Sequence, residues 1–208
     1  DLNLGFIHLT LSAEPLQPCT AGATDDIELE VTLTCDHATA NAGMDMTICA
    51  GENLNLNNAT ADHYETLSWS SQGDGSFSEV NSLNPVYTPG PQDIQNGGTT
   101  LCMTAFAYGV CNDATDCMNL SIEQPPTANA GNDQTICETA VVNISGIADN
   151  YSGIMWSSSG DGTFNDANSL NTSYTSGTTD LANGVFELCL NANGLNVCGD
   201  TQDCIVIT

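Results

Sequence analysis

The sequence predicts an all-β protein built from tandem, disulfide-bonded Greek-key β-sandwiches. Three observations predict this fold class: an internal repeat, short segments of alternating polarity within each repeat, and an even number of cysteines, ten in 208 residues. A hydrophobic content of 40% is enough to build packed cores. No segment shows a sustained 3.6-residue helical period.

The internal repeat sets the domain organisation. Thr39 to Gly43 recurs as Thr127 to Gly131, and Thr47-Ile48-Cys49 recurs as Thr135-Ile136-Cys137, both 88 residues later. Further matches lie 87 residues apart: Trp69-Ser70-Ser71 with Trp156-Ser157-Ser158, Gly73-Asp74-Gly75 with Gly160-Asp161-Gly162, Asn81 to Asn84 with Asn168 to Asn171, and Tyr87-Thr88 with Tyr174-Thr175. Residues 39–124 and 125–208 are therefore two complete repeats.

Residues 1–38 are expected to be the C-terminal half of a preceding repeat plus a linker. Four positions match the first complete repeat at an offset of 92: Asp1, Gly5, Leu9 and Cys19 fall on Asp93, Gly97, Leu101 and Cys111. Half of a sandwich leaves unpaired edges and an open core. Either upstream residues or a neighbouring subunit should complete it.

Short alternating segments predict the strands of each repeat. In the first repeat they are Leu54 to Leu56, Leu67 to Ser70, Ser76 to Ser78, Thr100 to Phe106 and Met118 to Ile122. Clusters of Gly, Asn, Asp and Pro separate them. Asp74-Gly75 and Asp161-Gly162 are predicted to form hairpin turns, and Gln124-Pro125-Pro126 a short, stiff linker.

The cysteines recur at fixed positions and indicate structural disulfides formed in an oxidising compartment. The partial repeat has Cys19 at the position of Cys111 but Thr10 and Asp25 where Cys102 and Cys117 would be. Two positions that lose cysteine together are expected to be partners. The predicted pairs are Cys102 with Cys117, Cys49 with Cys111, Cys189 with Cys204, and Cys137 with Cys198. The partner expected for Cys19 from its repeat position would lie upstream; within this chain, Cys19 is expected to pair with Cys35, which has no counterpart in the other repeats.

Charge excludes several partners. The chain has 26 Asp and Glu residues and no Lys or Arg, so its formal net charge is -26. Nucleic acid and anionic lipid surfaces bind proteins through Lys and Arg, so neither is an expected partner. The sequence has no apolar run of membrane-spanning length, hence no direct membrane insertion is expected, and no signal peptide is recognisable. His8, His37 and His63 lack the spacing of a zinc site.

The segment from Trp69 to Ser76 resembles PKD and related immunoglobulin-like repeats, in which an aromatic strand leads into Gly-Asp-Gly. One extra residue, and the lack of Asp after Trp, depart from that signature. The fuller pattern, Ala-Asn-Ala-Gly-x-Asp-x-Thr-Ile-Cys, then Trp-Ser-Ser, Leu-Asn-Pro-Val-Tyr-Thr-Pro-Gly and a late Cys, resembles the tandem repeats of giant cell-surface adhesins of Bacteroidota. These include gliding-motility adhesins exported by the type 9 secretion system. The resemblance implies an exported, surface-attached filament or stalk.

Candidate site residues have structural explanations. Trp69 and Trp156 are expected in the core rather than as sugar-stacking platforms, as are Tyr87 and Tyr174. An acidic set recurs in both repeats and is expected to be a solvated acidic end, with a Ca²⁺ site at the domain junction as the alternative: Asp45, Asp62, Asp113, Asp116, Asp133, Asp149, Asp200 and Asp203. No cofactor is otherwise expected.

No Ser, His and carboxylate set recurs between the repeats, so the sequence does not predict an enzyme. The leading hypothesis is a rod-forming segment of an extracellular, cell-surface adhesin or filament, whose partners are neighbouring repeats of the same or an adjacent chain. The alternatives are a fibre subunit completed by a neighbouring chain, or a module whose loops bind surface polysaccharide or protein.

Overall fold

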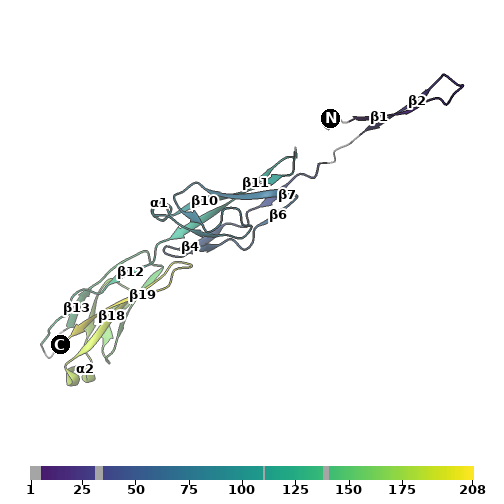
Figure 1. The fold of residues 1–208 in the computed structure, drawn as a ribbon. Helices are drawn as coiled ribbons and strands as arrows, with labels where there is room; N and C mark the ends of the chain where they lie inside the picture. Colours follow the sequence, from purple (N-terminus) through teal and green to yellow (C-terminus); the bar gives the residue numbers. More distant parts are fainter. Residues whose placement is uncertain (1–5, 31–34, 110, 138–140) are drawn as a thin grey trace.

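The computed structural model describes residues 6–30, 35–109, 111–137 and 141–208. It consists of a β-hairpin followed by two β-sandwiches that lie end to end in an elongated arrangement (Figure 1). Asp1 and Gly5, which the repeat pattern matched to Asp93 and Gly97, lie outside the described residues.

The hairpin consists of β1 (Phe6–Ala13) and β2 (Ala23–Glu30), which pair antiparallel. Its register is that of the last hairpin of the first sandwich, because Ser12 lies opposite Thr24 as Thr104 lies opposite Thr115. Every residue of the two strands is exposed. The hairpin therefore has the pairing of the two central strands of a sandwich sheet, but its own residues are not buried in a core.

That register corrects one alignment made from the sequence. Thr10 stands opposite Asp26, whereas Asp25 pairs with Leu11. The residue at the position of Cys117 is therefore Asp26 and not Asp25. The reason is one extra residue in the loop before Ala23, which shifts the second strand relative to the cysteine.

The first sandwich contains nine short strands and one helix. The chain order is β3 (Thr39–Asn41), β4 (Met46–Cys49), β5 (Leu54–Asn55), β6 (Thr60–Asp62), β7 (Tyr64–Ser71), β8 (Ser76–Phe77), β9 (Val86–Thr88), α1 (Pro91–Asn96), β10 (Gly98–Ala107) and β11 (Ala114–Glu123). One sheet has the order β4-β11-β10-β7, in which β4 runs parallel to β11. The other side is formed by β3-β6 and β5-β9-β8.

The second sandwich repeats this plan. Its elements are β12 (Thr127–Asn129), β13 (Val141–Ser145), β14 (Ile147–Asp149), β15 (Gly153–Ser158), β16 (Thr163–Phe164), β17 (Asn171–Thr175), α2 (Thr178–Asn183), β18 (Phe186–Asn193) and β19 (Thr201–Ile207). The sheet orders are β15-β18-β19, β13-β17-β16 and β12-β14. A parallel bridge from Gln134 to Ile207 stands where β4 pairs with β11.

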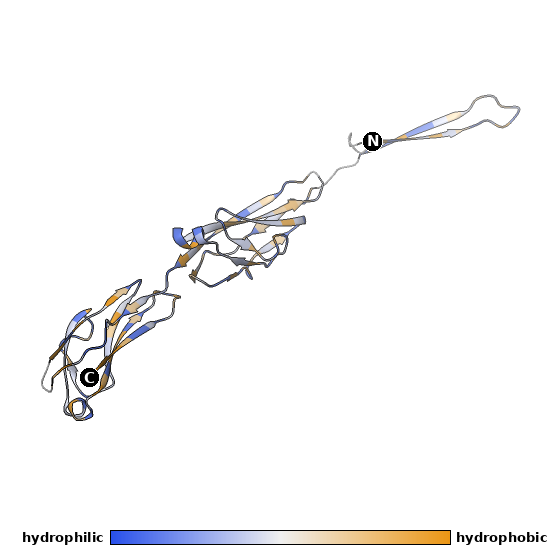
Figure 2. Cartoon of the chain, turned by 60° about the vertical axis from the view of Figure 1, so that its left-hand side comes forward, coloured by the Kyte–Doolittle hydropathy of each residue, from blue (hydrophilic) through white to orange (hydrophobic). Residues whose placement is uncertain are grey.

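Each sandwich encloses its own hydrophobic core. One cluster runs from Ala38 to Ile122 and the other from Ala130 to Ile207. Trp69 is 3% exposed and Trp156 2%, so the prediction that both belong to the core is confirmed. Tyr87 and Tyr174 are fully buried at equivalent positions. Hydropathy alternates along many of the strands (Figure 2), as expected where one face is buried and the other solvated.

The Gly-Asp-Gly segments are not hairpin turns, contrary to the sequence prediction. Strand β7 before Asp74 pairs with β10, whereas β8 after it pairs with β9 in the opposite sheet. The segment therefore crosses from one sheet to the other. Asp161 lies in the same crossover between β15 and β16.

Two short helices, α1 and α2, were not predicted. Each has six residues, which is too few to show a helical period. The local signal was nevertheless present, because Pro91 occupies the first turn and Gly97 ends α1 with a φ of 75°. Only glycine adopts this left-handed conformation without steric cost.

Candidate functional site

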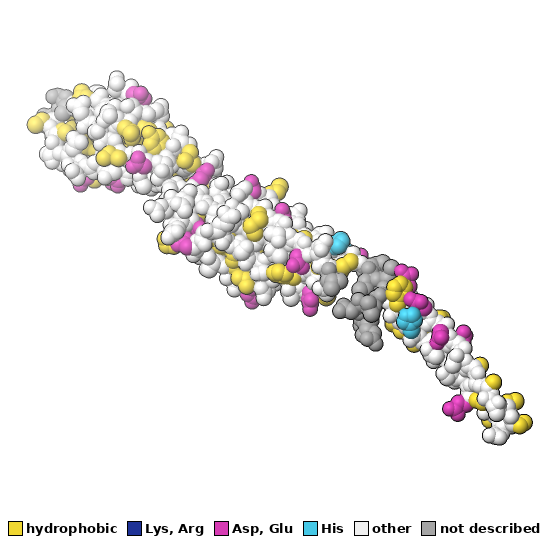
Figure 3. Space-filling model, turned by 90° about the horizontal axis from the view of Figure 1, so that it is seen from above, with side chains coloured by type: hydrophobic (Ala, Val, Ile, Leu, Met, Phe, Trp, Pro, Cys, Tyr) yellow, Lys and Arg dark blue, Asp and Glu magenta, His cyan; other side chains and the backbone are white. Residues whose placement is uncertain are grey.

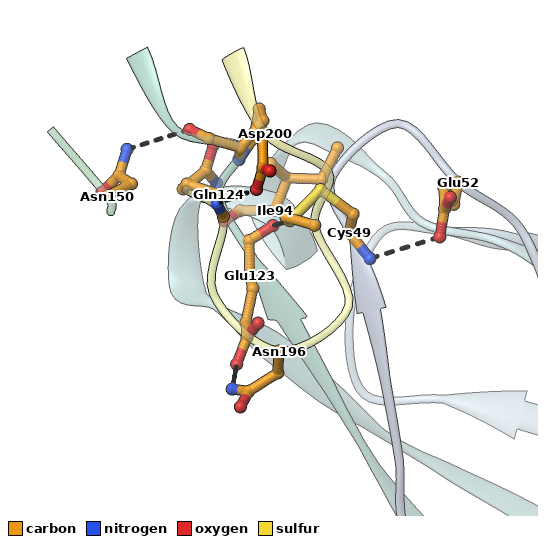
Figure 4. The surroundings of a disulfide bond; sticks show 11 residues. Cys49, Glu52, Ile94, Glu123, Gln124, Asn150, Asn196 and Asp200 are labelled. Atoms are coloured by element: carbon orange, nitrogen blue, oxygen red, sulfur yellow. Dashed lines mark hydrogen bonds between the residues drawn. A yellow bond between two sulfur atoms is a disulfide. The ribbon is translucent and has the colours of Figure 1, made fainter. Parts of the chain in front are cut away.

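The most distinctive feature of the molecule is the junction between the two sandwiches, which a disulfide crosses. Cys49 ends β4 of the first sandwich, and Cys198 lies in the loop between β18 and β19 of the second. Their Cα atoms are 5.0 Å apart, although 149 residues separate them in sequence. Figure 4 shows this bond among residues drawn from both sandwiches.

Polar contacts surround the disulfide. Asn196 donates its side-chain amide to Glu123, and the Cys198 sulfur lies 3.6 Å from the Glu123 carbonyl oxygen. The Gln124 amide donates to the carbonyl of Ile94 on α1 at 3.2 Å. The Asn150 amide donates to the Pro125 carbonyl at 3.4 Å. The linker between the sandwiches therefore makes hydrogen bonds to both of them, and its prolines restrict its backbone.

A second disulfide ties the first sandwich to the segment before it. Cys111, in the loop between β10 and β11, bonds to Cys35, which precedes β3. Cys111 and Cys198 occupy equivalent loops, and each finds its partner N-terminal to its own sandwich. We call these two residues, with Cys19 in the loop of the first hairpin, the tip cysteines.

Three predicted pairings are therefore wrong. Cys49 does not bond to Cys111, Cys137 does not bond to Cys198, and Cys19 does not bond to Cys35. The sequence argument assumed that each bond closes within one repeat. In the fold, a tip cysteine lies at the end of the sandwich that faces the preceding repeat, so it meets a cysteine from that side.

The other two bonds are the ones predicted from the joint loss of cysteine at their positions. Cys102 bonds to Cys117, and Cys189 bonds to Cys204. Both pairs face each other across the last hairpin of a sandwich. Among the described residues, Cys19 and Cys137 remain outside any disulfide, and both are exposed.

Most carboxylates of the recurring acidic set bind backbone N–H groups within their own sandwich. Carboxylates of the set accept backbone N–H groups: Asp116 from Ala42, Asp113 from Ala107, Asp45 from Asn119, with Asp203, Asp200 and Asp133 doing the same for Ala130, Gly194 and Val206. In the part of the chain that the structure describes, no three His, Cys, Asp or Glu residues form a group that could hold a metal ion. Acidic side chains lie scattered over the face shown in Figure 3.

A buried carboxylate was missed by sequence reasoning. Asp93 is 1% exposed and accepts hydrogen bonds from the Tyr87 hydroxyl at 2.6 Å and from the backbone N–H of Gly75 and Gly90 at 3.1 and 3.0 Å. In return, Asp74 accepts the N–H of Asp93 at 3.2 Å, at the first turn of α1. The Gly-Asp-Gly crossover and the helix are therefore fastened by two reciprocal carboxylates.

The second sandwich repeats this carboxylate network. Asp180 is 2% exposed and accepts from Tyr174 at 2.7 Å and from Gly162 and Gly177 at 3.1 and 3.0 Å. Asp161 accepts the N–H of Asp180, and hydrogen bonds from the start of α2 lower the pKa of Asp161. A Cβ at Gly160 would overlap the Asp180 carboxylate, which explains the glycine of the motif.

The network makes alkaline stability depend on Tyr87. Burial, followed by its hydrogen bond to Asp93, raises the Tyr87 pKa from 10.0 to about 12. The folded state therefore holds the phenolic proton more tightly than the unfolded chain, and this contribution is complete below pH 10.0 and lost as the pH rises through 12. We expect a late step in phenolate absorbance in rapid-mixing titrations, smaller in Tyr87→Phe but unchanged in Tyr151→Phe, which alters an exposed ring. Tyr174, whose pKa burial also raises, accounts for the part of the step that remains. A Tyr87→Phe titration identical to that of the unaltered chain would contradict this.

Trp69 and Trp156 are not placed as sugar-stacking platforms. Both rings are buried, and their indole N–H groups donate to the carbonyls of Ser82 and Ser169, each at 3.1 Å. The aromatic contacts among the described residues lie within the cores. The exposed rings of Phe106, Tyr108 and Tyr151 take part in none of them.

No family model and no curated protein matches the sequence. A protocadherin gammaB7 fragment, EC3-6, has a TM-score of 0.51 and 10% identity, with 99% of this chain and 60% of that one covered. The N-terminal eight immunoglobulin domains of Down Syndrome Cell Adhesion Molecule give a TM-score of 0.53 at 9% identity, covering 88% and 26%.

These similarities decide the fold. The chain is a tandem of immunoglobulin-like β-sandwiches. It spans about 60% of the length of the protocadherin fragment. Among the described residues, no helix has the length and hydropathy needed to span a bilayer.

Proposed function

We propose that this chain is a structural, rod-forming segment of an extracellular, cell-surface adhesin or filament. The observation that carries the proposal is the Cys49–Cys198 disulfide, which crosses the junction between two sandwiches placed end to end. A covalent bond at this position restrains the angle between neighbouring sandwiches, which is the property that a spacer requires. The buried tryptophans and scattered carboxylates are consistent with a segment that provides length rather than a binding site.

Composition supports the same proposal. Disulfides persist in oxidising surroundings, and four are present. The chain has no Lys or Arg, so proteases that cleave after basic residues find no site. The resemblance of the repeats to those of Bacteroidota adhesins extends the proposal to a surface-attached filament of the gliding-motility type, exported by the type 9 system.

Small-angle scattering tests the rod. We expect the maximum dimension of the oxidised chain to stay the same between low and high salt, because the junction is fixed by bonds rather than by charge repulsion. The control is a reduced and alkylated sample, in which the dimension should become dependent on salt. A compact or salt-dependent particle under oxidising conditions would argue against a spacer.

A second candidate function rests on the first hairpin. Leu9 and Leu11 are 50% and 73% exposed, whereas their equivalents Leu101 and Met103 are fully buried. In a fibre subunit, a neighbouring chain would cover this apolar face. Sedimentation of the intact chain over a concentration series discriminates the two candidates, because only the fibre subunit should associate, and Leu9→Glu should prevent that association.

A further inference from the structure

Cys137 occupies in the second sandwich the position of Cys49 in the first. Both follow Thr-Ile at an offset of 88 residues. Cys49 is 8% exposed and bonded to the tip cysteine of the next repeat. Cys137 is exposed and is in no disulfide. The same position therefore carries a disulfide in the first sandwich and a cysteine outside any disulfide in the second.

The surroundings of Cys137 resemble those of Cys49 before a partner covers them. A cavity of about 100 Å³ is lined by Cys137 with Ile136, Leu181, Phe186 and neighbouring polar groups. Leu181 on α2 is 46% exposed, whereas its equivalent on α1, Ile94, is half-buried beside the Cys49 disulfide (Figure 4). Figure 1 shows α1 at the junction and α2 at the opposite end of the second sandwich.

The established junction identifies what fits this surface. Cys198 reaches Cys49 from the loop of a sandwich that follows in the same chain, and Asn196 of that loop binds Glu123. A short linker keeps the loop close to its target and gives it an effective concentration in the millimolar range. The complementary group is therefore the tip cysteine of another repeat joined C-terminally.

We infer that Cys137 is a covalent docking site for a further immunoglobulin-like repeat in the same chain. The tip cysteine of that repeat bonds to Cys137, and its loop covers Ile136 and Leu181. Such a bond adds one junction to the proposed rod. Its biological role rests on that proposed function, but its chemistry does not. The surface has one occupant, and the bond repeats the geometry of Cys49 with Cys198.

The bond requires an oxidant, which a small disulfide such as oxidised glutathione supplies. The Cys137 thiolate attacks that disulfide, forms a mixed disulfide and releases one glutathione thiolate. The tip cysteine thiolate then attacks the Cys137 sulfur and displaces the second glutathione. In total, two thiols lose two protons and two electrons, and one glutathione disulfide becomes two glutathione thiols.

The test is a longer chain made by appending a copy of residues 122–208 after Thr208, which continues the repeat in register. Both chains are folded in a glutathione redox buffer. The remaining thiols are alkylated without denaturant, and the disulfides are mapped after cleavage at acidic residues. We expect Cys137 to be fully alkylated in the 208-residue chain. In the longer chain it should be protected, and linked to the appended copy of Cys198.

The control is the longer chain with Cys137→Ser, in which the appended copy of Cys198 should become alkylated while the other bonds persist. Alkylation of Cys137 in the longer chain would overturn the inference. Linkage of Cys137 to Cys19 of a second molecule would also overturn it, because the partner would then be another chain. Neither result affects the scattering test, so the rod proposal and this inference can fail separately.

Discussion

Removing the junction disulfide with Cys49→Ala and Cys198→Ala is expected to have the largest effect on both stability and shape. The bond closes a loop of 149 residues, for which the chain-entropy model gives a stabilisation of about 5 kcal/mol. The sandwiches should still fold, because each has its own core. Their mutual orientation should relax, since only the linker and a few hydrogen bonds remain.

Two measurements separate these effects. Denaturant unfolding gives the free energy, and small-angle scattering or NMR relaxation reports the motion between the sandwiches. The matched control is Cys102→Ala with Cys117→Ala, which opens a loop of only 15 residues inside one sandwich. This control should cost roughly 3 kcal/mol in the same model and leave the junction unchanged. Unaltered interdomain motion in the first variant would show that the bond does not restrain the rod.

Asp180→Ala is expected to destabilise the second sandwich by on the order of 4 kcal/mol. The substitution leaves the Tyr174 hydroxyl and the N–H groups of Asp161 and Gly177 without their acceptor, whereas the Gly162 N–H keeps its bond to the Tyr174 hydroxyl. Each buried donor without a partner costs about 1–3 kcal/mol. Trp156 is the only tryptophan of that sandwich, so its fluorescence, measured in a Trp69→Phe background, reports the transition.

The first sandwich provides the matching experiment. Asp93→Ala, followed through Trp69 in a Trp156→Phe background, should destabilise that sandwich by a similar amount. Asp149→Ala is the surface control and should change the free energy of unfolding by less than about 0.5 kcal/mol. Equal effects of Asp180→Ala and Asp149→Ala would mean that the buried network does not stabilise the fold.

The repeat made much of the fold predictable. A sequence that recurs at 87 to 88 residues with alternating strands constrains fold class, and the shared aromatic positions constrain the core. The pairing of Cys102 with Cys117 was predicted from Thr10 and Asp25, because a cross-strand bond needs both positions at once. The prediction survives the corrected register because Asp26, which lies opposite Thr10, is not a cysteine either. These inferences used relations within one repeat.

Relations between repeats were not predictable in the same way. Repeat position shows that Cys49 and Cys137 are equivalent, but not which repeat supplies the partner. The crossover at Asp74 was taken for a hairpin because its turn residues are the same, and only strand pairing distinguishes the two. The burial of Asp93 depends on α1, which is too short to leave a periodic signal.

The connectivity of the tip cysteines also imposes an order in time. During synthesis from the N-terminus, Cys49 appears 149 residues before Cys198, and five other cysteines are made in between: Cys102, Cys111, Cys117, Cys137 and Cys189. The native bond of Cys49 cannot form until the last loop of the following sandwich has been made. This junction is therefore completed one repeat late, so the growing chain carries Cys49 without its native partner while the whole second sandwich is being made.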